Sequence, residues 1–235
     1  MPVAPKARDV TLLTVVHGWT ADAARWLQSI VSHHGAKDYE VLIVDNSGDP
    51  EVTAWALGQA AERIRVLELR PAVGFGAAVN AGLKAAAGEY VILFDPGVEA
   101  VGDVVSPLLD ALRRPDVALA GGYGLRARGG VREFGEHKGP EVDALEGYCL
   151  AFRRSEALEA GGFDEKFRFY RIADIEFSFR MRQGGRRALV VPDLPVRRHT
   201  HRLWEATSAA DRERLSKKNM YRFLDRWGKR PDLVR

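Results

Sequence analysis

Apolar runs alternate with helix-like runs over the first 120 residues, and this alternation constrains the fold more than any other feature. The apolar runs are VTLLTVVH (10–17), EVLIV (40–44), IRVLEL (64–69) and YVILF (90–94). The runs between them, predicted to be helices, cover 21–34, 51–61 and 76–87. Strands that alternate with helices are typical of a parallel sheet covered on both faces. We therefore predict an α/β, Rossmann-like fold with a mostly parallel sheet.

The pattern changes after residue 120. A helix over 101–113 and a strand over 117–120 complete the alternation, and a glycine-rich, charged segment over 121–139 predicts a loop or hairpin. The later predicted elements are a strand over 146–152, helices over 155–160 and 172–183, a strand over 188–191 and a basic amphipathic helix over 209–227. We expect one domain over 1–204, in two halves that meet near residue 120, with the helix of 205–235 packed on or beside it.

Cysteine content and hydropathy limit the class of protein. The single cysteine, Cys149, excludes an internal disulfide framework and a cysteine-based zinc cage, and its apolar surroundings predict a core position. No apolar run approaches the roughly 18 residues of a membrane span, and the N-terminus lacks the apolar stretch of a signal peptide. We expect a cytoplasmic protein, with peripheral contact at the inner face of a membrane left open.

Charge is distributed unevenly along the chain. Residues 180–235 carry 16 Lys and Arg against 6 Asp and Glu, whereas residues 1–179 carry 19 against 26. A basic C-terminal part suits a partner rich in phosphate, and a solvated basic helix is the competing interpretation.

Polar residues follow three of the predicted strands where each strand ends. These groups are His17-Gly18, Asp45-Asn46 and Asp95-Pro96-Gly97. In a parallel sheet the carboxyl ends of the strands form the edge at which ligands bind. The glycines at 74 and 76 do not complete a dinucleotide fingerprint, because Ala77, Ala78 and Val79 follow them, and the chain has neither a P-loop nor a Gly-x-Ser-x-Gly elbow.

A series of motifs in a fixed order resembles a known family. The motifs are VVHG, WLQSI, VLIVDNSGD, GFGAAVNAGLKAAAGEYVILFDPGVE, EGYCLAFRRSEALEAGGFDEKFRFYRIADIEFSFRMRQGGRRALVVPD and HTH. This set, which covers about residues 10–204, resembles the inverting, nucleotide-sugar-dependent glycosyltransferases of family 2, and their rhamnosyltransferase-like branch in particular. The resemblance implies the glycosyltransferase-A fold, with nucleotide-sugar binding up to about residue 120 and the acceptor and catalytic half after it.

The resemblance implies a donor site built from residues of the first half. Asp45 matches the aspartate that binds the base or ribose, and Gly76 and Asn80 match the start of a helix near the donor phosphates. His17, Asn46 and Asp95 complete the donor-binding set. A role for Asp45 in capping its turn and a packing role for Gly76 are the competing interpretations.

The resemblance also implies a site for Mn²⁺ or Mg²⁺, with one departure. Asp95 stands in the acidic metal-binding motif, but Gly97 replaces its last acidic residue, which puts metal dependence in doubt. His199 is a second candidate ligand, and Glu99 is a candidate substitute for the missing carboxylate. Arg197, Arg198 and Arg202 offer an alternative means of binding phosphate.

The catalytic base implied by the resemblance is Asp174, in a segment where Ala173 replaces the usual glutamate. The competing interpretation is a helix N-cap. Glu176 stands for the second acidic residue of that segment. The remaining acceptor-side residues are Glu146, Gly147 and Tyr148, of which the tyrosine is suited to stack on a sugar ring.

The function that follows from these predictions is inverting transfer of a sugar from a nucleoside-diphosphate donor, UDP or dTDP in preference to GDP. The acceptor is a hydroxyl of a glycan, a lipid-linked sugar or a small molecule, as in polysaccharide biosynthesis. Two alternatives stay open: a catalytically weakened donor-binding homologue that acts as a partner or scaffold, and a sugar-nucleotide nucleotidyltransferase. A homodimer and contact with a membrane surface also stay open, and no nucleic-acid partner is expected.

Overall fold

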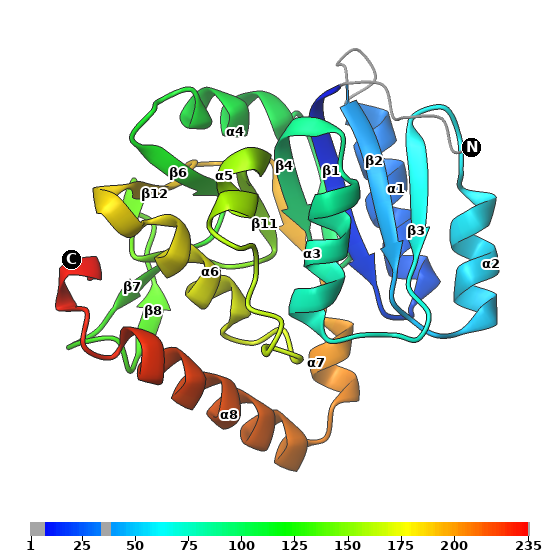
Figure 1. The fold of residues 1–235 in the computed structure, drawn as a ribbon. Helices are drawn as coiled ribbons and strands as arrows, with labels where there is room; N and C mark the ends of the chain where they lie inside the picture. The colour runs from blue at the N-terminus through cyan, green and yellow to red at the C-terminus, as the bar shows by residue number, and fades with distance from the viewer. Residues whose placement is uncertain (1–7, 34–38, 235) are drawn as a thin grey trace.

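The computed structural model describes residues 8–33 and 39–234, and an eight-stranded mixed sheet forms its centre (Figure 1). The order across the sheet is β3-β2-β1-β4-β11-β6-β12-β9. The pairs β3–β2, β2–β1, β1–β4 and β6–β12 are parallel, whereas β11 is antiparallel to both of its neighbours. The strands are β1 (Arg8–Val16), β2 (Tyr39–Asp45), β3 (Ile64–Glu68), β4 (Gly88–Phe94), β6 (Val117–Gly121), β9 (Glu141–Val142), β11 (Cys149–Arg153) and β12 (Arg187–Val190).

Helices cover both faces of this sheet, as predicted. Successive residues of a strand point to opposite faces, so Leu13 of β1 lies in one buried cluster and Leu12 in the other. One face carries α1 (Thr20–His33), α2 (Pro50–Gly58) and α4 (Val105–Leu112), and the other carries α3 (Phe75–Ala85), α5 (Arg154–Glu159), α6 (Ala173–Met181) and α8 (Ala209–Trp227). None of the helices in the described ranges is long and apolar enough to span a membrane.

Small strands that the hydropathy pattern left unassigned form two further sheets. The segment 121–139, predicted to be a loop or hairpin, contains β7 (Gly124–Ala127) and β8 (Phe134–Glu136), which form a small sheet with β10 (Ala144–Leu145). Farther along, β13 (Val196–Arg198) pairs with β5 (Val98–Ala100). Strands of two to four residues carry too few alternations for a periodic signal, so only their pairing defines them.

Helix α8 packs against the body of the molecule along one face (Figure 1). Its Phe223 ring is fully buried and meets Phe134 and Phe179 with ring centroids 5.8 and 5.0 Å apart. The sequence predicted this helix and its apolar side. A short helix, α7 (Arg202–Ala206), which the sequence analysis missed, precedes it, and the single turns η1 (Gln183–Gly185) and η2 (Pro231–Leu233) follow α6 and α8.

Candidate functional site

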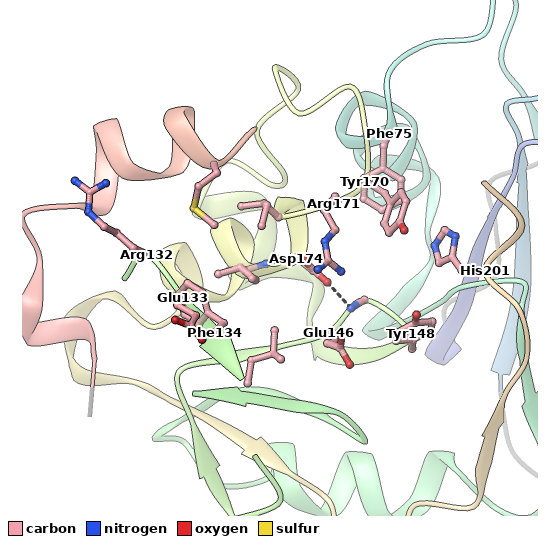
Figure 2. Close-up of a pocket in the computed structure, with 15 residues that line it drawn as sticks. Phe75, Arg132, Glu133, Phe134, Glu146, Tyr148, Tyr170, Arg171, Asp174 and His201 are labelled. Atoms are coloured by element: carbon pink, nitrogen blue, oxygen red, sulfur yellow. Dashed lines mark hydrogen bonds between the residues drawn. The ribbon is translucent and has the colours of Figure 1, made fainter. Parts of the chain in front are cut away.

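A pocket of about 250 Å³ lies between the first turn of α6, the loop before β11 and α8 (Figure 2). Its polar lining brings together residues that are far apart in the sequence. They are Glu146, Tyr148, Tyr170, Arg171, Asp174 and His201, with the Gly147 backbone beside them. Three of the predicted acceptor-side residues and the predicted base therefore line one cavity.

Asp174 is held in this pocket by backbone donors. Its Oδ2 accepts a hydrogen bond from the Gly147 N–H at 2.9 Å, and its Oδ1 accepts one from the Ile175 N–H at 2.9 Å. Burial raises the pKa of the Asp174 carboxyl, and these backbone donors and the charge of Arg171 oppose that rise in part. The result is a fixed carboxylate whose affinity for a proton is higher than that of an ordinary aspartate.

The backbone that leads to Asp174 is strained. Ile172, directly before α6, has a φ of 73°, in the left-handed region that a β-branched residue rarely adopts. Strain of this kind persists where the surrounding structure enforces it, often at functional sites. Here Ile172 is buried, and it lines the pocket between α6 and α8.

Glu146 supplies the second carboxylate of the pocket. Burial and the charge of Asp174 raise the pKa of Glu146 to about 7, although Arg198 opposes the rise. The Arg198 Nη1 donates to Glu146 Oε2 at 3.2 Å, and its guanidinium lies over the rings of Tyr123 and Tyr148, 4.4 and 4.9 Å from their centroids. The Tyr148 ring therefore packs against the Arg198 guanidinium and lines the pocket.

A second cluster, the sheet-edge cluster, lies where β1 and β4 end, and consists of His17, Asp95 and His201. Asp95 Oδ2 is 3.0 Å from His201 Nε2, and Asp95 Oδ1 accepts the Gly97 N–H at 2.7 Å. The His201 ring stacks on Tyr170 at 4.0 Å. Burial lowers the pKa of His17 to about 4, so this imidazole is neutral at pH 7. Its Nε2 is buried with no hydrogen-bond partner among the described residues.

Little space is left at the sheet-edge cluster. The two cavities beside it measure about 40 and 30 Å³, and His201 and Leu203 line both. The segment that carries them is fastened by the Arg202 Nε, which donates to Asp22 Oδ2 at 2.7 Å. Ligand pockets typically hold several hundred Å³, so a nucleotide would require this segment to move.

The histidine beside Asp95 in the structure is His201, whereas His199, the predicted candidate ligand, lies beside Glu99. The His199 Nε2 lies 2.8 Å from Glu99 Oε2 instead. Antiparallel pairing of β13 with β5 brings Glu99 opposite Arg197 and draws both residues away from Asp95. Glu99 therefore does not replace the missing acidic residue.

The arginines suggested as phosphate ligands all have carboxylate partners. Arg197 pairs with Glu99 at 3.2 Å, and Arg198 and Arg202 pair with Glu146 and Asp22 as described. Arg171, which the sequence analysis did not single out, lines the pocket without an ion pair in the part of the chain that the structure describes. Its position directly before the IADIE segment was the available signal.

Gly76 and Asn80, predicted to lie near the donor phosphates, contact the loop that contains Phe163–Arg168 and do not line the 250 Å³ pocket. The N–H groups of Phe75 and Gly76 donate to the carbonyls of Arg168 and Phe167 at 3.0 and 3.1 Å, so this helix start is occupied by backbone. A Cβ on Gly76 would lie 2.6 Å from the Asp164 carbonyl oxygen. The Asn80 side chain both accepts from the Phe163 N–H and donates to its carbonyl, each at 2.8 Å.

Asp45 and Asn46 hold the turns at the end of β2. Asp45 is 1% exposed, and its carboxylate accepts hydrogen bonds from the Ser47 N–H and hydroxyl and from the Thr53 hydroxyl. Asn46 exchanges two hydrogen bonds with the Val73 backbone, at 2.8 and 3.0 Å. These contacts favour the capping interpretation for Asp45.

Glu176, a predicted acceptor-side residue, forms ion pairs outside the pocket. It is 1% exposed, and its Oε1 accepts from Arg180 at 2.8 Å and from Arg226 at 2.9 Å. On α6 it lies two residues from Asp174, which turns its side chain toward a different face of the helix. It joins α6 to α8 and does not line the pocket.

The residues at the sheet edge do not form a metal site on their own. Within the described ranges no group of three or more His, Cys, Asp or Glu side chains is placed to hold a metal ion. Asp95 and His201 are the two candidate ligands, and their side chains lie 3.0 Å apart, Nε2 to Oδ2. A Cβ at Gly97, where the motif usually has its last acidic residue, would lie 2.8 Å from Asp95 Oδ1, so a side chain there would require the Asp95 carboxylate to shift.

Comparison with known proteins identifies the family. The sequence profile of glycosyl transferase family 2 matches residues 20–179. The chain belongs to glycosyl transferase family 2. The expected family is thus confirmed.

Curated relatives come from Mycobacterium tuberculosis. The N-acetylglucosaminyl-diphospho-decaprenol L-rhamnosyltransferases of its strains CDC 1551 / Oshkosh and ATCC 25618 / H37Rv are each 28% identical to this chain over 204 residues, which is 68% of this chain. The chain spans 66% of the length of these relatives.

Solved glycosyltransferase structures share the fold. GalNAc-T7 with UDP, GalNAc and Mn²⁺ aligns over 96% of this chain and 49% of its own, with a TM-score of 0.72 and 17% identity. The mannosyltransferase PcManGT from Pyrobaculum calidifontis, in complex with GDP-Man and Mn²⁺, covers 83% of this chain and 57% of its own, with a TM-score of 0.64 and 22% identity. The predicted glycosyltransferase-A fold is confirmed.

Proposed function

We propose that this chain transfers a sugar from a nucleoside-diphosphate donor to a hydroxyl of an acceptor bound in the 250 Å³ pocket, with inversion at the anomeric carbon. The observation that carries the proposal is Asp174, a carboxylate fixed by two backbone N–H groups in a cavity that a sugar could enter. Family membership supports the reaction class.

Asp174 acts as the base of a single displacement. Its carboxylate takes the proton of the acceptor hydroxyl while the acceptor oxygen forms a bond to the anomeric carbon. The bond from that carbon to the diphosphate oxygen breaks, and the electron pair leaves with the nucleoside diphosphate. One displacement inverts the configuration, so a single base suffices. The raised pKa of Asp174 favours this proton transfer.

Arg171 stabilises the charge that develops on the departing diphosphate. Its guanidinium lines the same pocket as Asp174. The positive charge of Arg171 lowers the pKa values of Asp174, Glu146 and Tyr170 without forming an ion pair with either carboxylate. An arginine with no carboxylate partner has its full hydrogen-bonding capacity available for phosphate oxygens. We derive no step through a metal ion, because the residues at the sheet edge do not form a metal site on their own.

The donor enters at the sheet-edge cluster, at the carboxyl ends of β1 and β4. We propose that the segment carrying His201 and Leu203 moves aside, because the cavities there are too small for a nucleotide. Asp95 and His17 would then face the donor, and UDP or dTDP is the proposed nucleotide. The lipid-linked sugar named as substrate of the mycobacterial relatives supports a sugar hydroxyl as the acceptor.

An Asp174→Asn variant tests the base. Amide replaces carboxylate at constant shape, so we expect turnover to fall by about 100-fold or more while nucleotide affinity is retained. Calorimetric titration with UDP, dTDP and GDP measures affinity, and the anomeric configuration of the product measures inversion. Glu133→Gln is the matched control, because Glu133 is an exposed carboxylate at the rim of the same pocket. Full activity in Asp174→Asn would contradict the assignment.

A weakened donor-binding homologue is the second candidate function. The closed crevice at the sheet edge and Gly97 in place of an acidic residue favour it. Nucleotide binding without turnover by the wild-type chain, over a panel of donor and acceptor sugars, would support this candidate and count against the first.

A further inference from the structure

A groove of about 710 Å³ runs along α8, on the side that faces α7 and the loop before α6. Nothing in the proposed reaction accounts for it. Its base is fixed, because the Asn219 side chain of α8 donates to the carbonyls of Phe169 and Arg171, each at 2.8 Å.

The groove adjoins the 250 Å³ pocket. Arg132, Arg171, Ile172 and Met220 line both cavities, so these residues mark the junction. Figure 2 shows Arg132 on the side of the pocket nearest α8 and Arg171 beside Asp174, below Tyr170. The shared lining residues therefore place the groove next to the pocket that holds Asp174.

The groove carries a strong positive charge. Arg132, Arg171, Arg212 and Lys217 line it, against the single carboxylate of Glu213. None of these four cations has an ion-pair partner within the ranges that the structure describes. Elsewhere on the same helix, Arg214 and Arg226 are paired with Asp211 and Glu176. Unpaired cations lined up in a groove favour an anionic occupant.

The groove also offers apolar surface. The Trp204 ring carries the guanidiniums of Arg171 and Arg212, 5.5 and 5.0 Å from its centroid. Tyr221, which is 61% exposed, and Leu224 line the groove beyond these arginines. An exposed aromatic side chain in a cavity rimmed by cations is typical of a site for an amphiphilic ligand.

We propose that this groove binds the diphosphate and the adjoining hydrocarbon chain of a lipid-linked acceptor, whose sugar lies in the 250 Å³ pocket at Asp174. The order of chemistry in the cavities matches the order of parts in such a molecule. The sugar lies at Asp174, the diphosphate at Arg132, Arg212 and Lys217, and the hydrocarbon on Trp204 and Tyr221. This inference rests on the proposed function, because it takes the pocket at Asp174 as the acceptor site.

Calorimetric titration with farnesyl diphosphate, and with inorganic diphosphate beside it, tests the groove without any turnover. We expect farnesyl diphosphate to bind the wild-type chain more tightly. The double variant Arg212→Ser/Lys217→Ser should weaken its binding by about tenfold or more, because two charged partners are lost. The matched control is Arg214→Ser/Lys218→Ser, which removes the same charge from the same helix outside the groove. This control should bind as the wild type does.

Tyr221→Ser tests the apolar part separately. It should weaken the binding of farnesyl diphosphate and leave that of inorganic diphosphate unchanged. Equal binding of the two compounds by the wild-type chain, or equal loss in both double variants, would overturn the proposal. So would a groove variant that loses binding only to phosphatidylglycerol vesicles, because that result assigns the groove to a membrane surface.

Failure of the groove and failure of the proposed function give different results. If the groove is wrong, farnesyl diphosphate binding is insensitive to Arg212 and Lys217, while Asp174→Asn still abolishes turnover. If the proposed function is wrong, Asp174→Asn remains active whatever the groove binds. UDP affinity should be the same in all the groove variants, which also shows that they are folded.

Discussion

Replacing Asn219 with alanine should destabilise the whole domain, because this side chain ties α8 to the loop that leads into the active pocket. Asn219 is 3% exposed, and its amide donates two hydrogen bonds, to the carbonyls of Phe169 and Arg171. Each lost bond costs about 1 kcal/mol net, and a carbonyl left buried without a partner costs about 1–3 kcal/mol. The Phe169 bond is buried and the Arg171 bond partly so, and water can reach the second carbonyl. We expect a loss of about 3 kcal/mol in the free energy of unfolding.

Urea unfolding followed by circular dichroism measures this loss directly. For a chain of this length, 3 kcal/mol corresponds to a fall in Tm of about 6–12 °C. Lys218→Ala is the matched control, since the neighbouring side chain is exposed, and it should change stability by less than about 0.5 kcal/mol. A loss below about 1 kcal/mol in Asn219→Ala, with an unchanged urea m-value, would refute the reasoning and leave α8 as a loosely attached helix.

Two further predictions concern the pocket and the sheet edge. Because the pKa of Glu146 is raised to about 7, turnover should rise as the pH increases through about 7, since an ionised Glu146 makes Asp174 more basic. Glu146→Gln should remove that inflection from the pH–rate profile, and an inflection that persists would contradict the assignment. The pKa of Glu146 in the folded chain exceeds its ordinary value of 4.5. Its contribution to the free energy of unfolding is therefore complete below about pH 4.5 and is lost as the pH rises through about 7. The glutamine variant should therefore resist urea better than the wild type above pH 7. At the sheet edge, UDP affinity should change little when EDTA replaces Mn²⁺, and Gly97→Asp should weaken UDP binding by displacing Asp95. Tighter, Mn²⁺-dependent binding by that variant would show that the third ligand can be restored.

The sequence predicted the central sheet correctly for a physical reason. Strands buried on both faces need apolar residues at most positions, so β1, β2 and β4 appear as near-continuous apolar runs. Their carboxyl ends share one edge, so His17 and Asp95 were expected together, and both line the sheet-edge cavities.

The contacts of individual polar side chains were less predictable. Asp45 and Asn46 were expected to face a ligand, but their nearest donors and acceptors lie in the adjoining turns. Asn80 meets Phe163, which is 83 residues away, and no local pattern announces such a partner. Helical spacing alone predicts that Glu176 and Asp174 lie on different faces of α6. Only the packing of α8 against α6 shows that Arg226 is the partner of Glu176.

What the sequence by itself determined, then, is the order and type of the major elements, the family and the loops from which site residues come. These follow from hydrophobic periodicity and from short motifs, which are local properties of the chain. Tertiary structure decided that His201 and not His199 meets Asp95, that Arg171 has no ion pair among the described residues, and that a groove along α8 shares lining residues with the pocket at Asp174. Those outcomes depend on strand register and on the competition of several carboxylates for the same cations, which is settled only when distant segments pack together.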